Sequence, residues 1–191
     1  WHAQLSARGG TLIVDEAFAD TMPFASLAGS TDRTGLVVLR SPGKFFGLAG
    51  VRAGFVLAVP ALLAPLREAL GAWTVSGPAR HAVTAAFNDT EWQRAMRARL
   101  DKDSARLAAL LDAHRLPFSR TPLFAWTPDT RAAALHHALA QRGIWTRFFP
   151  APASVRFGLP ATDAQWSRLE QGLTDSMHAV DTTLLSTLHD R

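Results

Sequence analysis

The chain has 191 residues, of which 48% are hydrophobic and 19% charged, a composition typical of a globular protein with one or two cores. It contains no cysteine, which excludes disulfides, thiolate metal ligands and cysteine nucleophiles. Its net charge of +4 comes from arginines spread among acidic residues, which indicates solvated helix faces rather than a nucleic-acid site. No run approaches about eighteen apolar residues and no secretory leader is recognisable, so we expect no membrane span and a cytoplasmic location.

The first half of the chain predicts a layered α/β arrangement. Three short apolar runs are typical of strands, at residues 11–14, 34–41 and 52–60. The first run is β-branched and follows a glycine pair, so we expect a parallel strand covered on both faces and ending at the carboxylates of Asp15 and Glu16. Helices are expected at residues 61–73, 77–87 and 89–114, the last with Asp89 as its N-cap.

After Leu116 the pattern changes to shorter elements. We expect strands at residues 123–128, 144–149 and 154–160, a helix from Thr130 to Arg142 and a final helix from Asp163 to about Val180. The long helix at 89–114 then joins a sheet domain to a small α/β domain. We therefore divide the chain into residues 1–103 and residues 104–191.

Lysine is rare in this chain, since Lys44 and Lys102 stand against eighteen arginines. Lys102 lies between Asp101 and Asp103 on the long helix and is most simply a solvated surface residue. Lys44 follows a predicted buried strand in the run RSPGKFFGLAGVRAGF, residues 40–55, where we expect its ammonium to be poorly hydrated. Poor hydration favours the free amine, which condenses with aldehydes, as arginine cannot. The alternative is a lysine that extends from the loop into solvent.

Several groups around Lys44 suit a single ligand. Ser41 and Arg52 can supply a hydroxyl and a bidentate guanidinium for a phosphate close to the amine. Asp15, at the end of a predicted strand, needs a cationic partner, and a protonated pyridine nitrogen would be one. Glycines in the same run let backbone pass near a flat ligand; they are Gly43, Gly47, Gly50 and Gly54. Together these groups predict pyridoxal 5'-phosphate as the cofactor.

Two segments also resemble a known family. VDEAF at residues 14–18, followed by RSPGKFFGLAGVRAGF, is similar to the aspartate and lysine segments of fold type I pyridoxal-phosphate enzymes, in the aminotransferase class I/II group. The resemblance continues through GAWTVSGPAR, QRGIWTRFF and SVRFGLP, so it covers most of the chain. It implies an α/β fold made of the end of a large-domain sheet, a long bridging helix and a small α/β domain.

The resemblance also implies roles for five residues. Lys44 would carry the cofactor as a Schiff base, and Asp15 would pair with its pyridine nitrogen. Ser41 and Arg52 would hold the cofactor phosphate, and Arg156 would bind the carboxylate of the substrate. Lys44 is in addition the expected donor of the proton that replaces a lost carboxylate.

The reaction expected from the resemblance is a decarboxylation. Within the family the segments are most similar to the branch that acts on L-threonine O-3-phosphate, a phosphorylated amino acid, and yields aminopropanol phosphate for cobalamin biosynthesis. Histidinol-phosphate aminotransferases are similar over the same segments and provide the alternative reaction. Phe18 stands where many relatives, those aminotransferases among them, have a tyrosine, and its ring cannot hydrogen-bond the phenolic oxygen of the cofactor. The form DEAF favours the decarboxylase branch.

Enzymes of this family are much longer than 191 residues, so we expect the chain to be a C-terminal fragment. We also expect a homodimer, because fold type I sites commonly form at a dimer interface. A catalytically silent dimerisation or interaction module is the alternative from another functional class. No metal is expected, since the seven histidines lack ligand spacing and the adjacent His136 and His137 point in different directions on a helix.

Overall fold

The computed structural model describes the backbone of residues 1–189 and the side chains of residues 1–180. The chain separates into two compact units, Trp1–Gln93 and a second unit that begins at Arg94, and each is described by itself. The division lies within helix α4, after Gln93, whereas the sequence analysis divides the chain after residue 103. No described helix is both long and apolar enough to cross a membrane.

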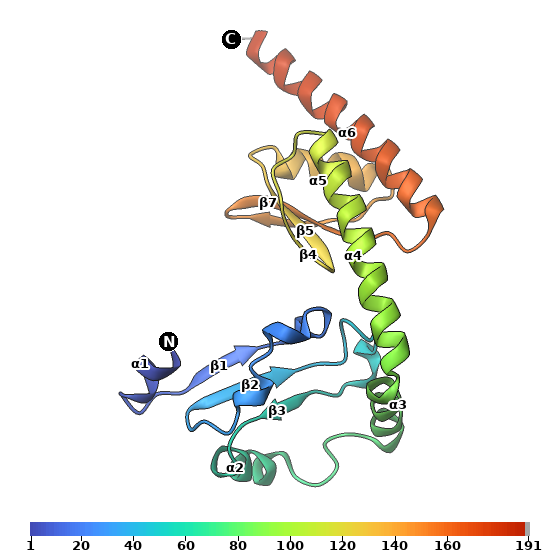
Figure 1. Ribbon diagram of the computed structural model, residues 1–191. Coiled ribbons are helices and arrows are strands. Elements are labelled where there is room, and N and C mark those ends of the chain that lie inside the picture. Colours follow the sequence, from blue (N-terminus) through green and yellow to red (C-terminus); the bar gives the residue numbers. More distant parts are fainter. Residues whose placement is uncertain (190–191) are drawn as a thin grey trace. The chain divides into compact units, whose positions relative to one another are not determined.

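Unit 1 combines a small sheet with short helices (Figure 1). Its strands are β1 (Leu12–Asp15), β2 (Leu36–Arg40) and β3 (Phe55–Leu57). Its α-helices are α1 (His2–Ser6), α2 (Pro60–Leu70) and α3 (Gly77–Asn88). Four 3₁₀ turns fill the connections: η1 (Ala19–Thr21), η2 (Pro23–Ala25), η3 (Ala28–Ser30) and η4 (Ala49–Val51). The three predicted strands and two helices of this half are thus present.

The sheet of unit 1 has the order β1-β2-β3. Strands β1 and β2 are parallel, with Asp15 opposite Leu39, whereas β3 runs antiparallel to β2. The expectation that β1 is covered on both faces is wrong, because Ile13 is 62% exposed and burial alternates along the strand. No described residue of unit 1 covers this side chain, so β1 has the alternating burial of a one-sided sheet.

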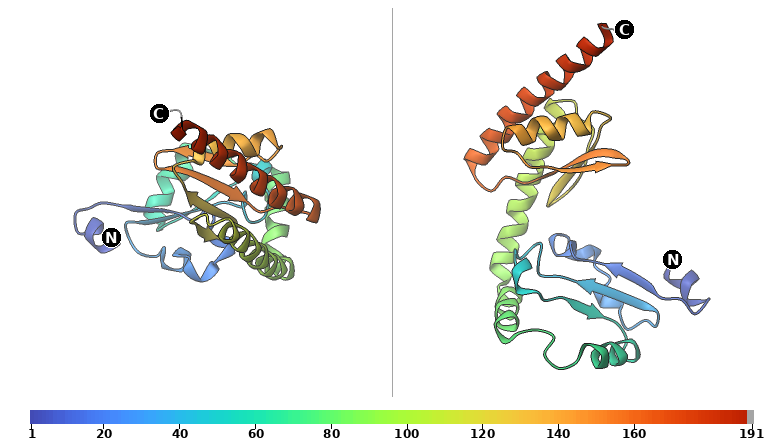
Figure 2. Two further views of the ribbon diagram at one scale, coloured as in Figure 1. Left: turned by 90° about the horizontal axis from the view of Figure 1, so that it is seen from above. Right: turned by 180° about the vertical axis from the view of Figure 1, so that it is seen from behind.

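Unit 2 packs helices on one face of a four-stranded antiparallel sheet, as Figures 1 and 2 show. The sheet order is β4-β5-β7-β6. Its strands are β4 (Ser119–Thr121), β5 (Phe124–Pro128), β6 (Arg147–Pro150) and β7 (Ala153–Gly158). Its helices are α5 (Ala132–Gln141), α6 (Asp163–His189) and the part of α4 (Thr90–Ala113) beyond Gln93. Strand β4 was not predicted, because Ser-Arg-Thr contains no apolar residue.

The core of unit 2 lies between this sheet and its helices. It joins buried leucines of α4, α5 and α6 to the inward residues of β5 and β7, among them Ala125, Val155 and Phe157. Two predicted features of the helices can be checked. The Asp89 cap is confirmed, since the Trp92 backbone N–H donates to Asp89 Oδ1 at 2.9 Å. Helix α6 begins at Asp163 as predicted and continues beyond Val180 to His189.

Acidification is expected to destabilise unit 2 through His114, which follows helix α4. Burial, and then the nearby His178, lowers the pKa of His114 below the ordinary histidine value of 6.5. The unfolded chain therefore binds the proton first as the pH falls through 6.5, and stability is lost until the folded state is protonated too. We expect the unfolding midpoint of the wild type to fall more steeply than that of His114→Gln between about pH 8 and 5.5.

The matched control for this experiment is His137→Gln, which removes an exposed histidine of the same unit. Because this variant keeps His114, the pH dependence that His114 causes is expected to persist in it. Parallel pH profiles for the wild type and His114→Gln would contradict the prediction.

Candidate active site

The carboxyl ends of β1 and β2 bring two of the predicted site residues to one edge of the sheet. Asp15 ends β1 opposite Leu39, and Ser41 follows the last residue of β2. Because parallel neighbours end at the same edge, the two side chains leave the sheet on the side where α/β proteins bind ligands. Asp15 is exposed, and its Oδ1 accepts a hydrogen bond from the Ala17 backbone N–H at 2.9 Å. Its carboxylate forms no ion pair with a described residue.

The segment after Ser41 folds back tightly on itself. Ser41 Oγ accepts from the Gly43 N–H at 3.1 Å, and the Gly47 N–H donates to the Lys44 carbonyl at 3.1 Å. A Cβ on Gly43 would lie 3.2 Å from Ser41 Oγ and 3.3 Å from the Ala49 Cα, closer than side chains normally approach. Glycine at 43 therefore allows the turn that presents the neighbouring Lys44.

The Lys44 side chain extends into solvent in this unit. Lys44 is exposed, and its Nζ lies 5.6 Å from the centroid of the Phe18 ring, within the range of a cation–π contact. The poorly hydrated ammonium expected from the sequence is therefore not present in this chain. No described residue of the unit covers the end of the side chain. The contact with Phe18 does join the lysine segment to the aspartate segment, three residues beyond Asp15.

Arg52 completes the loop in an unusual backbone conformation. Its φ is 53° and its ψ is 45°, the left-handed region that non-glycine residues rarely adopt. The guanidinium is exposed, and Nη1 donates to the Ala49 carbonyl at 3.2 Å. Such strain persists where the surrounding structure imposes it, and it clusters at functional sites. The conformation is consistent with an arginine held in place for a ligand.

A largely buried ion cluster lies behind this edge, and the sequence analysis missed it. Arg40, at the end of β2, pairs with Asp20 and, at 3.4 Å, with Glu16. Ser26 Oγ donates to Glu16 Oε2 at 2.5 Å, and the Leu27 N–H donates to Glu16 Oε1 at 2.6 Å. The cluster fixes the segment after Asp15 to the strand that precedes Ser41. A signal was present in the sequence, since Glu16 lies within the aspartate motif, Asp20 follows it by two residues, and Arg40 directly precedes Ser41.

Aromatic side chains anchor the other end of the lysine segment. Phe45 is buried and lies edge-on to Trp92, with ring centroids 5.4 Å apart. Phe46 stacks on Trp92 at 5.9 Å and also contacts Phe87 at 5.1 Å, which in turn contacts Phe55 at 5.4 Å. These rings come from the loop, β3, α3 and the first turn of α4. The backbone directly after Lys44 is therefore held by packing rather than by hydrogen bonds alone.

The fifth predicted residue, Arg156, belongs to unit 2. It lies on β7, is partly buried, and its guanidinium carbon is 4.7 Å from the Phe124 ring centroid. The register of the sheet places it between Trp126 on β5 and Arg147 on β6. Arg147 was not singled out from the sequence. Neither arginine forms an ion pair with a described residue.

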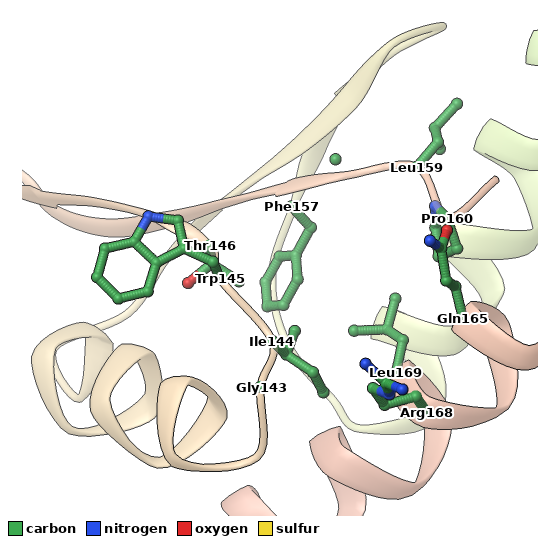
Figure 3. A pocket seen from close by; sticks show the side chains of 11 residues that line it. Gly143, Ile144, Trp145, Thr146, Phe157, Leu159, Pro160, Gln165, Arg168 and Leu169 are labelled. Carbon is green, nitrogen blue, oxygen red and sulfur yellow. The ribbon is translucent and has the colours of Figure 1, made fainter.

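A cavity of about 330 Å³ opens in unit 2 near the end of β7 (Figure 3). Its lining comes from residues 143–146, residues 157–160, Gln165, Arg168 and Leu169. Arg156 is not part of the lining, because neighbours along a strand point to opposite faces and Phe157 points to the core. No predicted site residue therefore faces this cavity. Among the described residues, histidine and acidic side chains form no group that could hold a metal ion.

Unit 1 thus presents four different chemical groups on adjoining segments. Lys44 offers an amine that can condense with a carbonyl, and Ser41 and Arg52 offer a hydroxyl and a cation for an anion. Asp15 offers a carboxylate at the same sheet edge. The set suits a ligand that carries a carbonyl group, a protonated nitrogen and an anionic group.

Comparison with known proteins identifies the family. The model of the family "Aminotransferase class I and II" matches residues 3–169. The chain is 53% identical over 174 residues to a threonine-phosphate decarboxylase of Pseudomonas aeruginosa, covering 91% of this chain and 53% of the relative. It is 43% identical over 175 residues to a threonine-phosphate decarboxylase of Sinorhizobium sp, covering 90% of this chain and 52% of that relative. It therefore spans about half the length of these curated relatives.

Solved structures confirm the fold. A histidinol-phosphate aminotransferase from Clostridium acetobutylicum superimposes with a TM-score of 0.80 at 20% identity, covering 92% of this chain and 57% of that one. At this identity the likeness speaks for the fold alone. It agrees with the fold type I architecture expected from the sequence, of which the chain covers a part. From the family match over most of its length, we conclude that the chain belongs to the aminotransferase class I and II family.

Proposed function

We propose that the enzyme to which this chain contributes uses pyridoxal 5'-phosphate to decarboxylate L-threonine O-3-phosphate, giving aminopropanol phosphate for cobalamin biosynthesis. The observation that supports the proposal most is that the segments carrying Asp15, Ser41, Lys44 and Arg52 adjoin the carboxyl edge of β1 and β2, where Arg40 also pairs with Phe55 of β3. The two relatives with 53% and 43% identity, both named threonine-phosphate decarboxylase, support the choice of reaction.

The residues of unit 1 fit this cofactor in number and kind. Ser41 and Arg52 would hold its phosphate, and Asp15 would pair with its protonated pyridine nitrogen. Lys44 would be its point of attachment. The crowded glycine at 43 and the left-handed backbone at Arg52 support the fit, because both are features that a generic surface loop does not need. When bound, pyridoxal phosphate supplies an electron sink for the carbanion that a departing carboxylate leaves behind.

The side chains of the protein have three tasks in the proposed reaction. Asp15, as a carboxylate, keeps the ring nitrogen protonated. Arg156 orients the carboxylate that is to leave, since a guanidinium binds a carboxylate through two parallel hydrogen bonds. Lys44 holds a proton at Nζ and delivers it to the carbon from which carbon dioxide departs.

Two anionic groups of the substrate match two facing arginines. Arg147 and Arg156 lie directly opposite each other in the β6–β7 ladder, where like charges are destabilising unless an anion lies between or beside them. Each guanidinium already covers an aromatic ring, Phe149 for Arg147 and Phe124 for Arg156. We assign the carboxylate to Arg156 and the phosphate to Arg147, because a phosphorylated amino acid carries both anions.

The assignment of Arg147 is tested with Arg147→Gln. Loss of a hydrogen bond to a charged group is expected to raise KM for threonine phosphate about 10- to 100-fold. Inhibition by unphosphorylated L-threonine is expected to change little, because it lacks the group that Arg147 binds. The matched control is Arg168→Gln, which replaces an exposed arginine of the same unit. It should change neither KM for threonine phosphate nor the inhibition by L-threonine. Equal losses for both ligands would contradict the assignment.

The reaction itself is tested with the enzyme as encoded by its gene. Threonine phosphate is supplied with and without a 2-oxoacid, and carbon dioxide and the consumption of the oxoacid are measured. We expect carbon dioxide in both cases and no consumption of the oxoacid. Transamination without carbon dioxide would overturn the proposed reaction in favour of an aminotransferase, the activity named for the Clostridium acetobutylicum structure.

A homodimer is part of the same proposal. Helix α2 buries none of its residues and exposes Leu62, Leu66 and Leu70 at one-turn spacing, with Trp73 beyond it 97% exposed. An apolar helix face of this kind is typical of an interaction surface. Sedimentation velocity of the enzyme, with Leu66→Glu as the comparison, tests whether two copies associate through it. A dimer unaffected by this substitution would exclude α2 from the interface.

A further inference from the structure

The face of the unit 2 sheet that points away from its helices carries two adjacent arginines. Val155 and Phe157 of β7 enter the core, so Arg156 between them faces the other way. Arg147 of β6 lies directly opposite Arg156 in the ladder. Neither guanidinium forms an ion pair with a described residue or donates a hydrogen bond to one. All their N–H donors thus remain for a ligand.

Each guanidinium lies over a phenyl ring, and the two rings lie on opposite sides of the row that holds the arginines. The Arg156 guanidinium carbon is 4.7 Å from the ring centroid of Phe124, which pairs with Gly158, two positions after Arg156 on β7. The Arg147 guanidinium carbon is 5.6 Å from the centroid of Phe149. Phe149 pairs with the residue two positions before Arg156. The two guanidiniums therefore lie toward opposite ends of the strands rather than side by side.

The rings hold the arginines without using their hydrogen-bond donors. A guanidinium is planar, stacks on an aromatic ring by its face, and directs its N–H groups outward in its own plane. Gly158, opposite Phe124, has no side chain to cover that ring, and even an added Cβ would meet nothing within 4 Å. Arg156 can therefore reach the ring diagonally across the ladder. A side chain that is ordered before its ligand arrives loses less conformational freedom on binding.

We propose that Phe124 and Phe149 are positioning residues, each of which preorganises one anion-binding arginine: Phe124 acts on Arg156 for the substrate carboxylate, and Phe149 acts on Arg147 for the substrate phosphate. The inference rests on the proposed function and extends it to the class of substrate. Two guanidiniums held apart bind two anions of one molecule, whereas a ligand with a single anion engages only one of them. The site then favours amino acids that carry a second anion on a short side chain.

Two ligands test the two halves of this arrangement separately. L-Threonine has the carboxylate without the phosphate, and aminopropanol phosphate has the phosphate without the carboxylate. Their dissociation constants are measured by calorimetry on the enzyme loaded with its cofactor. Phe124→Leu is expected to raise the dissociation constant of L-threonine about two- to five-fold, the size of a cation–π contact at an exposed site, and to leave that of aminopropanol phosphate unchanged. Phe149→Leu is expected to have the reverse selectivity.

Three controls separate positioning from packing. Tyrosine at position 124 or 149 keeps the ring face and should restore wild-type binding. Trp145→Leu removes an exposed ring of the same unit that contacts His136, and it should change neither dissociation constant. In Arg156→Gln, the addition of Phe124→Leu should not weaken the binding of L-threonine further, because the ring then has no guanidinium to hold.

A leucine variant that weakens both ligands by the same factor would overturn the inference, since its ring would then contribute only to the packing of unit 2. A loss on adding Phe124→Leu to Arg156→Gln as large as the loss in the wild type would overturn it too. Failure of the proposed function has a different signature. A wild type that binds both ligands but releases no carbon dioxide from threonine phosphate would overturn the reaction, and the binding series would still decide the role of the rings. A wild type that binds neither ligand would overturn both.

Discussion

Replacing Lys44 by arginine is expected to abolish covalent capture of pyridoxal phosphate by this chain. In the enzyme the same change should lower the rate of decarboxylation by about 10²- to 10⁴-fold or more, the contribution of a positioned proton-transfer group. Arginine keeps the positive charge and can still lie over Phe18, but it cannot condense with an aldehyde. The purified chain is incubated with the cofactor and reduced with borohydride, and the modified peptide is identified by mass spectrometry.

Lys102→Arg is the matched control, because it removes the other lysine of the chain from an acidic, solvated stretch of helix α4. It should leave both the adduct and the rate unchanged. An adduct at Lys102 equal to that at Lys44 would mean that the aldehyde reacts with any exposed lysine. A wild-type chain that forms no adduct would support a catalytically silent module instead.

Replacing Arg40 by methionine is expected to lower the free energy of unfolding of unit 1 by about 3 kcal/mol, as removal of one partner of a buried ion pair typically does. The side chain of Arg40 is 21% exposed, and those of its partners Glu16 and Asp20 are 5% and 11% exposed. Methionine would leave two carboxylates close together with no cation between them. Urea denaturation, followed by circular dichroism, measures the change.

Arg33→Met controls for the loss of a positive charge, since Arg33 is exposed, precedes β2 in the same unit and has no ion pair with a described residue. Arg33→Met should lower the free energy of unfolding of unit 1 by less than about 0.5 kcal/mol. Adding Glu16→Gln and Asp20→Asn to Arg40→Met should restore much of the stability, because no buried charge is then left unpaired. A triple variant no more stable than Arg40→Met would show that the cost comes from packing.

Local sequence patterns were sufficient for most elements of the fold. Apolar runs predicted β1, β2, β3, β5, β6 and β7, and the helical periodicity of residues 89–114 predicted α4 with its cap. These elements follow from side-chain spacing and capping chemistry, which act over a few residues. Strand β4 was not predicted, because its extended conformation depends on antiparallel pairing with β5 rather than on its own composition.

The candidate site was predictable only as a set of residue types. Lys44, Ser41 and Arg52 share one short segment, so their proximity follows from the chain itself. The hydration of Lys44 was misjudged, since burial of the preceding strand does not determine what covers the loop that follows it. The Gly43 turn shows the same limit, because its crowding by Ala49 depends on how the loop closes.

The amino-acid sequence by itself determined the family, the lysine and aspartate segments and the strands that carry them, because each depends on neighbours along the chain. Only the tertiary structure decided that Arg40 pairs with Glu16 and Asp20, that the Lys44 amine lies over the Phe18 ring, and that Arg147 faces Arg156. These contacts join residues from different strands and loops. Arg147 faces Arg156 because of the register between β6 and β7, whereas the other two contacts depend on how the segments after β1 and β2 fold, which spacing along one segment does not specify.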